Sequence, residues 1–505
     1  MVNYIEISNL IFEDYNQLID AMKAAYPLWK GNYWSSASIR KMIEQFPEGQ
    51  IVIKADGKVV GCALSIIVDY DTFGDVHTYK QITGNYQFNT HNARGNVLYG
   101  IEVFIHPDYR GMRLGRRLYD ARKELCENLG LRAIVFGGRI PGYRKHAADM
   151  TPKEYIQKVK QKELYDPVLS FQISNDFHVK KVLKNYMPED DESMNFATLL
   201  QWDNVNYEET HKPQFQGKSY VRLGLVQWQM RPYKDLEELF TQLEYFIDSV
   251  AAYKSDFAVF PELFNGPLMA GFNDLPEVEA MRRLAGYTPD IRAKFSELAI
   301  KYNVNIITGS LPSIEGTELR NIGYLCHRNG NVDQYEKIHI TPDEAKAWGI
   351  KGSNVLKVYE TDAGRVGILI CYDVEFPELA RLLADQGMQI LFVPFLTDTQ
   401  NAYMRVRCCA QARAIENECY VAITGSVGNL PKVTNMDIQY SQSVVFTPCD
   451  FAFPYNGIKS EATPNAEMVL ISDVDLLLLN ELHMYGSVRN LKDRRTDFYN
   501  LSFRE

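Results

Sequence analysis

Apolar positions in the first part of the chain recur at strand and helix spacings. At 97–105 every second residue is apolar, which predicts a strand with one buried face. From 114 to 129 apolar residues recur at helical spacing until Gly130, where we expect the helix to end. The Asp56-Gly57 pair between two apolar runs predicts a hairpin. Further strands are predicted at 132–136 and 196–202.

From about residue 220 onward, segments with strand spacing alternate with segments with helical spacing. Such alternation predicts a layered α/β domain whose chemistry lies at the ends of its strands. Asn329-Gly330 predicts a hairpin turn within it. The predicted strands are 220–228, 257–260, 305–311, 366–370, 389–394 and 420–425, and the predicted helices are 236–250, 290–302 and 401–418.

A polar segment without periodicity separates the two halves. Residues 205–218, VNYEETHKPQFQGK, contain Pro and Gly and predict a linker. With 505 residues the chain is too long for a single core. We therefore predict one domain at 1–204 and a second at 219–505.

Composition and charge narrow the functional classes. The chain is 46% hydrophobic and 23% charged, as in ordinary globular domains, and its net charge of −10 disfavours nucleic-acid and membrane partners. No apolar run reaches the roughly 18 residues of a membrane helix, and the N-terminal stretch lacks the layout of a signal peptide. The eight cysteines form no CxxC pair and no zinc pattern, so we expect no metal and a cytoplasmic location.

A basic, glycine-containing loop lies between the predicted strand at 97–105 and the helix that follows. Arg110, Gly111, Arg113 and Gly115 in this loop suit phosphate binding, because loop amides and a helix N-terminus attract anions. The alternative is a solvated basic face. The context IEVFIHPDYRGMRLGRRLY resembles the acetyl-CoA-binding motif of the GNAT acetyltransferases, Arg/Gln-x-x-Gly-x-Gly/Ala. Arg113 departs from it, because a glycine is expected there, and its side chain would either crowd or contact the pyrophosphate.

This resemblance implies an α+β acetyltransferase domain that uses acetyl-CoA as co-substrate and an amine as acceptor. Glu102 is the candidate base, because it faces away from the alternating apolar side of its strand; the alternative is a solvated carboxylate. Residues 139–188 are longer and more charged than a minimal acetyltransferase needs, and we expect an insertion that shapes the acceptor site.

Three residues in the second half stand at the ends of predicted strands or just beyond them. They are Glu262 in FAVFPELF, Lys337 in QYEKIHITPDEAKAW and Cys371 in ILICYDVEFPE. Singly they read as a capping glutamate, a solvated lysine and a packing cysteine. Together they form a chemically complete set, and with their flanking residues they resemble the nitrilase superfamily of carbon–nitrogen hydrolases over 220–490. The resemblance implies an α-β-β-α sandwich.

The resemblance also implies a role for each residue. Cys371 is the nucleophile, Glu262 the general base and acid, Lys337 the oxyanion stabiliser, and Glu344 a second glutamate beside them. A thiol is mostly protonated at neutral pH and needs such a base or cation. The Tyr372 N–H is the expected second oxyanion donor.

We therefore expect a bifunctional enzyme: an N-acetyltransferase joined to a hydrolase of linear amides, with small amides and amines as substrates. By resemblance the fold mostly cleaves amides or carbamoyl amines, and nitrile cleavage is the minority case; we favour a linear amide because the motif CYDVEFPE resembles the amidase-like branches. A second interpretation makes the N-terminal domain a non-catalytic CoA-binding regulator, and a third makes the hydrolase fold a mere scaffold. By resemblance we expect a homo-oligomer.

Overall fold

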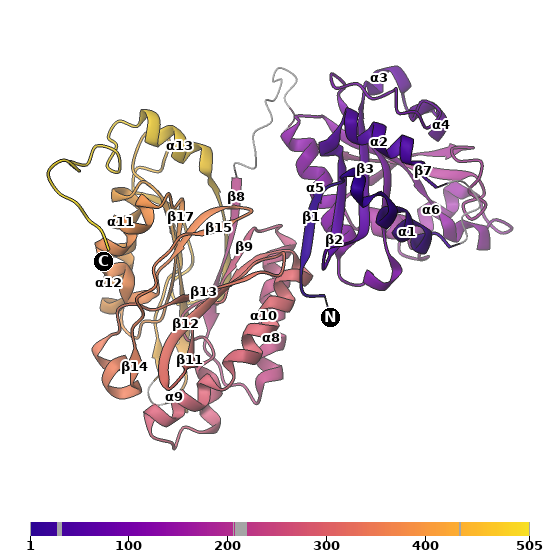
Figure 1. Cartoon of the computed structure of the whole chain (residues 1–505). Coiled ribbons are helices and arrows are strands. Elements are labelled where there is room, and N and C mark those ends of the chain that lie inside the picture. The colour runs from indigo at the N-terminus through magenta and orange to yellow at the C-terminus, as the bar shows by residue number, and fades with distance from the viewer. Residues whose placement is uncertain (1, 28–32, 206, 208–219, 434–435, 504–505) are drawn as a thin grey trace. The chain divides into compact units, whose positions relative to one another are not determined.

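A computed structural model describes residues 2–27, 33–205, 207, 220–433 and 436–503 of the chain. The chain divides into two compact units, Met1–Lys218 and Ser219–Glu505 (Figure 1). The predicted linker at 205–218 lies almost wholly outside the described residues, so its conformation stays a prediction.

The N-terminal unit is built on one seven-stranded sheet in the order β1-β2-β3-β4-β5-β7-β6. All neighbouring strands are antiparallel except β4 and β5, which are parallel. The predicted hairpin at Asp56-Gly57 is confirmed, since it joins β2 to β3. The strands are β1 (Ile5–Asn9), β2 (Gln50–Ala55), β3 (Lys58–Val68), β4 (Val97–Ile105), β5 (Ala133–Arg139), β6 (His178–Lys184) and β7 (Phe196–Asp203).

Helices pack on this sheet, and the one predicted at 114–129 is confirmed as α5. Alternate residues of β3, such as Leu64 and Ile66, share a core with Leu18 and Met22 of α1. The helices are α1 (Tyr15–Ala25), α2 (Ser36–Gln45), α3 (Tyr70–Phe73), α4 (Tyr79–Ile82), α5 (Leu114–Asn128), α6 (Pro152–Lys160) and α7 (Leu169–Ile173).

The expected insertion at 139–188 is only partly an insertion. Residues 178–184 form β6, which pairs with β7 at the sheet edge and so belongs to the sheet itself. Its exposed, lysine-containing sequence lacks the apolar alternation that would reveal a strand, as is common at sheet edges.

In the C-terminal unit, parallel strands alternate with helices, and the α/β class predicted for it is confirmed. The sheet path runs β11-β12-β10-β9-β8-β18-β17-β16-β15. Its strands include β8 (Tyr220–Gln229), β9 (Phe257–Val259), β10 (Asn305–Ile307), β11 (Leu311–Glu315), β12 (Glu318–Cys326), β13 (Val332–Glu336), β16 (Gly364–Ile368), β17 (Ile390–Phe395), β18 (Tyr420–Asn429), β20 (Val444–Phe446) and β22 (Met468–Asp475). The others are β14 (Ile350–Lys351), β15 (Tyr359–Thr361), β19 (Ile438–Gln439) and β21 (Ile458–Glu461).

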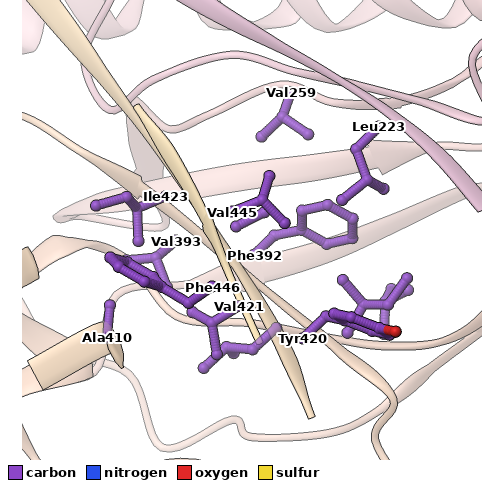
Figure 2. Packing of buried hydrophobic residues seen from close by; sticks show 14 of the residues in the cluster. Leu223, Val259, Phe392, Val393, Ala410, Tyr420, Val421, Ile423, Val445 and Phe446 are labelled. Carbon is purple, nitrogen blue, oxygen red and sulfur yellow. The ribbon is translucent and has the colours of Figure 1, made fainter. Parts of the chain in front are cut away.

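Two apolar cores lie on the two faces of β8. Leu223 faces Phe392 of β17 and Val445 of β20, as Figure 2 shows, whereas Trp228 packs with α8 and α10. This two-sided burial produces the expected layers of helix, sheet, sheet and helix. The helices are α8 (Leu236–Ala252), α9 (Glu277–Ala285), α10 (Thr288–Tyr302), α11 (Pro377–Asp385), α12 (Gln400–Glu416) and α13 (Leu476–Tyr485).

One predicted strand of this unit is wrong in extent. The segment 305–311 is divided between β10 and β11, because Gly309 has a φ of +70° and turns the chain. Among the described residues, no helix is both long enough and apolar enough to cross a membrane.

Candidate active site

The side chain of Lys337 lies at the centre of the C-terminal site. It follows β13 directly, and its Nζ is 2.8 Å from Glu262 Oε1 and 2.7 Å from Glu344 Oε1. All three side chains are buried. The structure therefore brings Glu262 to Lys337 and Glu344, although it lies 75 residues before Lys337 in the sequence.

Cys371 lies beside this cluster. It follows β16 and begins the 3-10 turn η7 (Cys371–Glu375), with a φ of +48° that L-residues rarely adopt. Its Sγ is 3.6 Å from the carbonyl oxygen of Leu396, and the N–H of Leu396 donates to Glu262 Oε2 at 3.0 Å. One peptide segment thus contacts both the thiol and the carboxylate.

Burial and charge set the protonation of these groups. Burial raises the pKa of Glu262, an effect that the Lys337 ammonium partly offsets. Burial also disfavours the ammonium of Lys337, but Glu262 and Glu344 outweigh it and raise the pKa of Lys337 well above its usual value. The pKa of Glu344 is lowered, because Lys337 and hydrogen bonds from Thr341 outweigh the effect of burial.

Burial and the same charged groups also shift the pKa of the Cys371 thiol. Burial and the neighbouring Glu262 raise its pKa well above the usual value, and Lys337 offsets this only in part. The raised pKa favours the protonated thiol, so forming the thiolate would require a neighbouring base such as Glu262.

Sequence reasoning missed two residues that hold the carboxylates. Asn321 on β12 donates from Nδ2 to Glu262 Oε1 at 2.9 Å, and no local motif marks it. Thr341 donates to Glu344 Oε2 from both its N–H and its hydroxyl, each at 2.9 Å. This second contact is a capping box, and the spacing Thr-x-x-Glu could have revealed it.

Tyr372 is the second residue of η7. Backbone N–H groups in the first turn of a helix have no acceptor within that helix, so the Tyr372 N–H is suited to an outside acceptor. Its role in the reaction stays a prediction.

In the N-terminal unit, the predicted loop leads directly into α5. Gly111 has a φ of +83° and Arg113 a φ of +56°, so Arg113 adopts the left-handed conformation that a glycine would take most easily. A Cβ added at Gly115 would lie 2.8 Å from the ring of Phe171 on α7, so a larger residue there would make this ring shift. An added Cβ at Gly111 would meet no atom within 4 Å, so space is open there.

The interpretation of Glu102 requires a correction. A bulge leaves Ile101 without a partner, so that Glu102 pairs with Leu64 and Gly100 with Ser65. After the bulge the alternation is reversed, and Glu102 lies on the same sheet face as Leu64 and Phe104, which belong to the apolar core. The prediction that it faces away from the apolar side is wrong.

Glu102 is nevertheless placed in an unusual environment. It accepts a hydrogen bond from the Tyr26 hydroxyl at 2.8 Å, and burial raises the pKa of its carboxyl group. Near it β4 and β5 separate, because they pair only at Val97–Tyr99 and Ala133–Val135.

Known proteins resemble both units. The carbon-nitrogen hydrolase family model matches residues 222–484, and that of the GNAT acetyltransferase family matches residues 15–146. A Bacillus subtilis (strain 168) protein, "Probable hydrolase YhcX", is 43% identical over 500 residues, which cover 99% of this chain and 97% of that protein.

Two further relatives each match one unit. "Uncharacterized N-acetyltransferase YkwB" of Bacillus subtilis (strain 168) is 31% identical over 206 residues, which are 40% of this chain and 91% of that protein. "Omega-amidase NIT2" of Homo sapiens is 27% identical over 288 residues, which are 55% of this chain and 96% of that protein. This chain therefore belongs to the carbon-nitrogen hydrolase family and carries a domain of the GNAT acetyltransferase family before its hydrolase domain.

Proposed function

We propose that the C-terminal unit is an amidase that hydrolyses a linear amide through a thioester on Cys371. The observation that carries this proposal is the buried cluster in which Lys337 joins Glu262 and Glu344 beside the Cys371 thiol. A base, a cation and a nucleophile are what acyl transfer from an amide requires.

Hydrogen-bond capacity supports the assignment of roles. Lys337 has three ammonium donors, of which contacts with Glu262 and Glu344 use two, so one remains for an oxyanion. Glu262 Oε2 accepts from the Leu396 N–H and keeps a lone pair for the thiol proton.

The reaction then proceeds in two halves. Glu262 takes the proton of Cys371, and the thiolate attacks the amide carbon, whose oxygen becomes an anion facing Lys337 and the Tyr372 N–H. Glu262 returns the proton to the leaving nitrogen, the carbon–nitrogen bond breaks, and ammonia or an amine departs. Water deprotonated by Glu262 attacks the thioester, and the acid leaves as Cys371 regains its proton.

Linear amides are the favoured substrates over nitriles and carbamoyl amines. The likeness to "Omega-amidase NIT2" supports this choice and suggests half-amides of short dicarboxylic acids as first probes. We expect the purified chain to release ammonia from such half-amides and the Cys371→Ala variant to lose this activity. Cys408→Ala, which changes an exposed thiol, is the matched control. Full hydrolysis by Cys371→Ala would contradict the mechanism.

For the N-terminal unit we propose acetyl-CoA binding and acetyl transfer to an amine. The loop at 110–113 and the start of α5 suit the pyrophosphate, since Gly111 and Arg113 already have left-handed backbones and the 15-residue α5 presents its N-terminus. When bound, acetyl-CoA supplies the acetyl thioester, and Glu102 would take the proton of the acceptor amine. The alternative is that the N-terminal unit binds CoA without catalysis and regulates the hydrolase.

Calorimetry with acetyl-CoA and an acetyl-transfer assay over a panel of amines separate these two functions. Binding with transfer that Glu102→Gln abolishes supports the acetyltransferase. Binding without transfer, together with a change in amide hydrolysis when acetyl-CoA is added, supports the regulator. Absence of binding contradicts both.

A further inference from the structure

The nucleophile turn η7 holds Cys371 in a strained conformation. Its φ of +48° lies in the left-handed region, which non-glycine residues occupy only where the surrounding structure leaves no alternative. Two buried charged side chains outside the proposed catalytic cluster hold this turn, one from within the turn and one from α12.

Asp373, the middle residue of the turn, connects it to the segment that carries Lys337. Its carboxylate is buried and accepts hydrogen bonds from the N–H of Ile338 at 3.1 Å and of His339 at 2.6 Å. The His339 Nδ1 lies 3.0 Å from the same carboxylate. The His339 ring stacks on Phe376, just after the turn, with centroids 3.6 Å apart.

Arg413 of α12 holds the end of the turn. Its Nε donates to the carbonyl of Val374 at 3.0 Å and its Nη2 to that of Glu375 at 3.2 Å. The last carbonyls of a helical turn have no partner within it, so this buried guanidinium satisfies them. Glu416 orients Arg413 by accepting from Nη1 at 2.9 Å.

We infer that Asp373 and Arg413 are positioning residues that keep Cys371 in its reactive conformation. The inference rests on the proposed function for the role of Cys371, but the contacts that carry it are independent of any substrate. Asp373 also connects the nucleophile turn to the backbone just after Lys337. The positions of Cys371 and Lys337 are therefore coupled.

The test measures Cys371 itself as well as turnover. Asp373→Asn, Arg413→Met and Arg413→Lys are compared with Arg407→Met, a change on the same helix in a residue that pairs with Glu461 and the Tyr403 hydroxyl. Alkylation by iodoacetamide is followed by mass spectrometry of the Cys371 peptide, and ammonia release from half-amides gives kcat and KM.

We expect Asp373→Asn and Arg413→Met to lower both kcat and the Cys371 alkylation rate by about ten- to a hundredfold with KM nearly unchanged, since small misplacements cost this much. Arg413→Lys should recover part of the rate and Arg407→Met should match the parent chain. If Arg413→Met does not fold, the kcat and the alkylation rate of Asp373→Asn and Arg413→Lys still test the inference.

Parental kcat and alkylation rates in Asp373→Asn and in both Arg413 variants would overturn the inference. So would a loss confined to thermal stability with unchanged rates per folded molecule. Failure of the proposed function looks different: the parent chain would release no ammonia, or Cys371→Ala would retain hydrolysis, while alkylation still reports on the turn.

Discussion

At the scale of single residues, the donors around each buried carboxylate set the pKa of that carboxylate. Burying charges is costly unless each one is paired and hydrogen-bonded. Lys337 neutralises part of the charge of Glu262 and Glu344, and Asn321, Thr341 and the Leu396 N–H donate further hydrogen bonds to them. The outcome is one glutamate whose pKa is raised and another whose pKa is lowered, which suits a proton carrier beside a fixed anion.

Asn321→Ala tests this tuning of Glu262. The variant removes a hydrogen bond to the ionised carboxylate, so the pKa of Glu262 should rise further. Because the ionised form is the base, the acid limb of kcat/KM should move upward by about one pH unit, and activity should recover at higher pH. A pH–rate profile measures this, with Gln334→Ala, whose amide contacts Glu336, as control. An unshifted profile would contradict the role of Asn321.

At the scale of elements, irregular backbone determines where functional side chains point. The bulge in β4 turns Glu102 toward the apolar face, and left-handed residues shape the loop before α5. Such irregularities have no signature in the hydrophobic pattern, although each changes the direction of a side chain.

Arg113 and Gly111 allow a matched pair of substitutions at the start of α5. Arg113→Gly should stabilise the N-terminal unit by about 1 kcal/mol, because it relieves a left-handed L-residue. Gly111→Ala should destabilise it by about 1 kcal/mol for the converse reason. Thermal unfolding of the full chain measures both, and shifts of the same sign would refute the backbone argument.

Calorimetry on the Arg113 variant also decides what its side chain does. If the guanidinium contacts the pyrophosphate, Arg113→Gly should weaken acetyl-CoA binding severalfold, and the loss should shrink at high salt because ions screen the interaction. Tighter binding by the variant would instead mean that the side chain crowds the phosphates.

At the scale of the whole molecule, each unit has its own sheet and its own apolar core. Two relatives match a single unit each, and the match covers nearly the full length of each relative. Each fold therefore occurs without the other. Independent folding is therefore expected for the two predicted domains.

Separate expression of 1–204 and 219–505 tests these boundaries. We expect each piece to unfold cooperatively, and the second to release ammonia with a kcat within about threefold of the full chain, because its site contains residues of that unit alone. Size-exclusion chromatography with light scattering then reports which piece carries the predicted homo-oligomer. An insoluble or inactive second piece would show that the boundary is misplaced or that the units depend on each other.

The sequence alone determined the α/β classes and most strands, and it marked Glu262, Lys337, Cys371 and Glu344 as candidate site residues whose catalytic roles stay a prediction. Apolar periodicity is a local property, and the three strand-end motifs are contiguous, so both can be read from neighbouring residues. Edge strand β6 was missed because it has no apolar alternation, and the break at Gly309 was missed because apolar residues continue on both sides of that glycine.

Only the tertiary structure decided how the site is held. Asn321 and the Leu396 peptide reach Glu262 from positions 59 and 134 residues away, and no local pattern marks such contacts. The direction of Glu102 depends on one unpaired residue in its strand, and the conformation of Cys371 depends on partners from other elements. Hydrogen bonds between distant segments form only when the layers pack, so their geometry is a property of the fold.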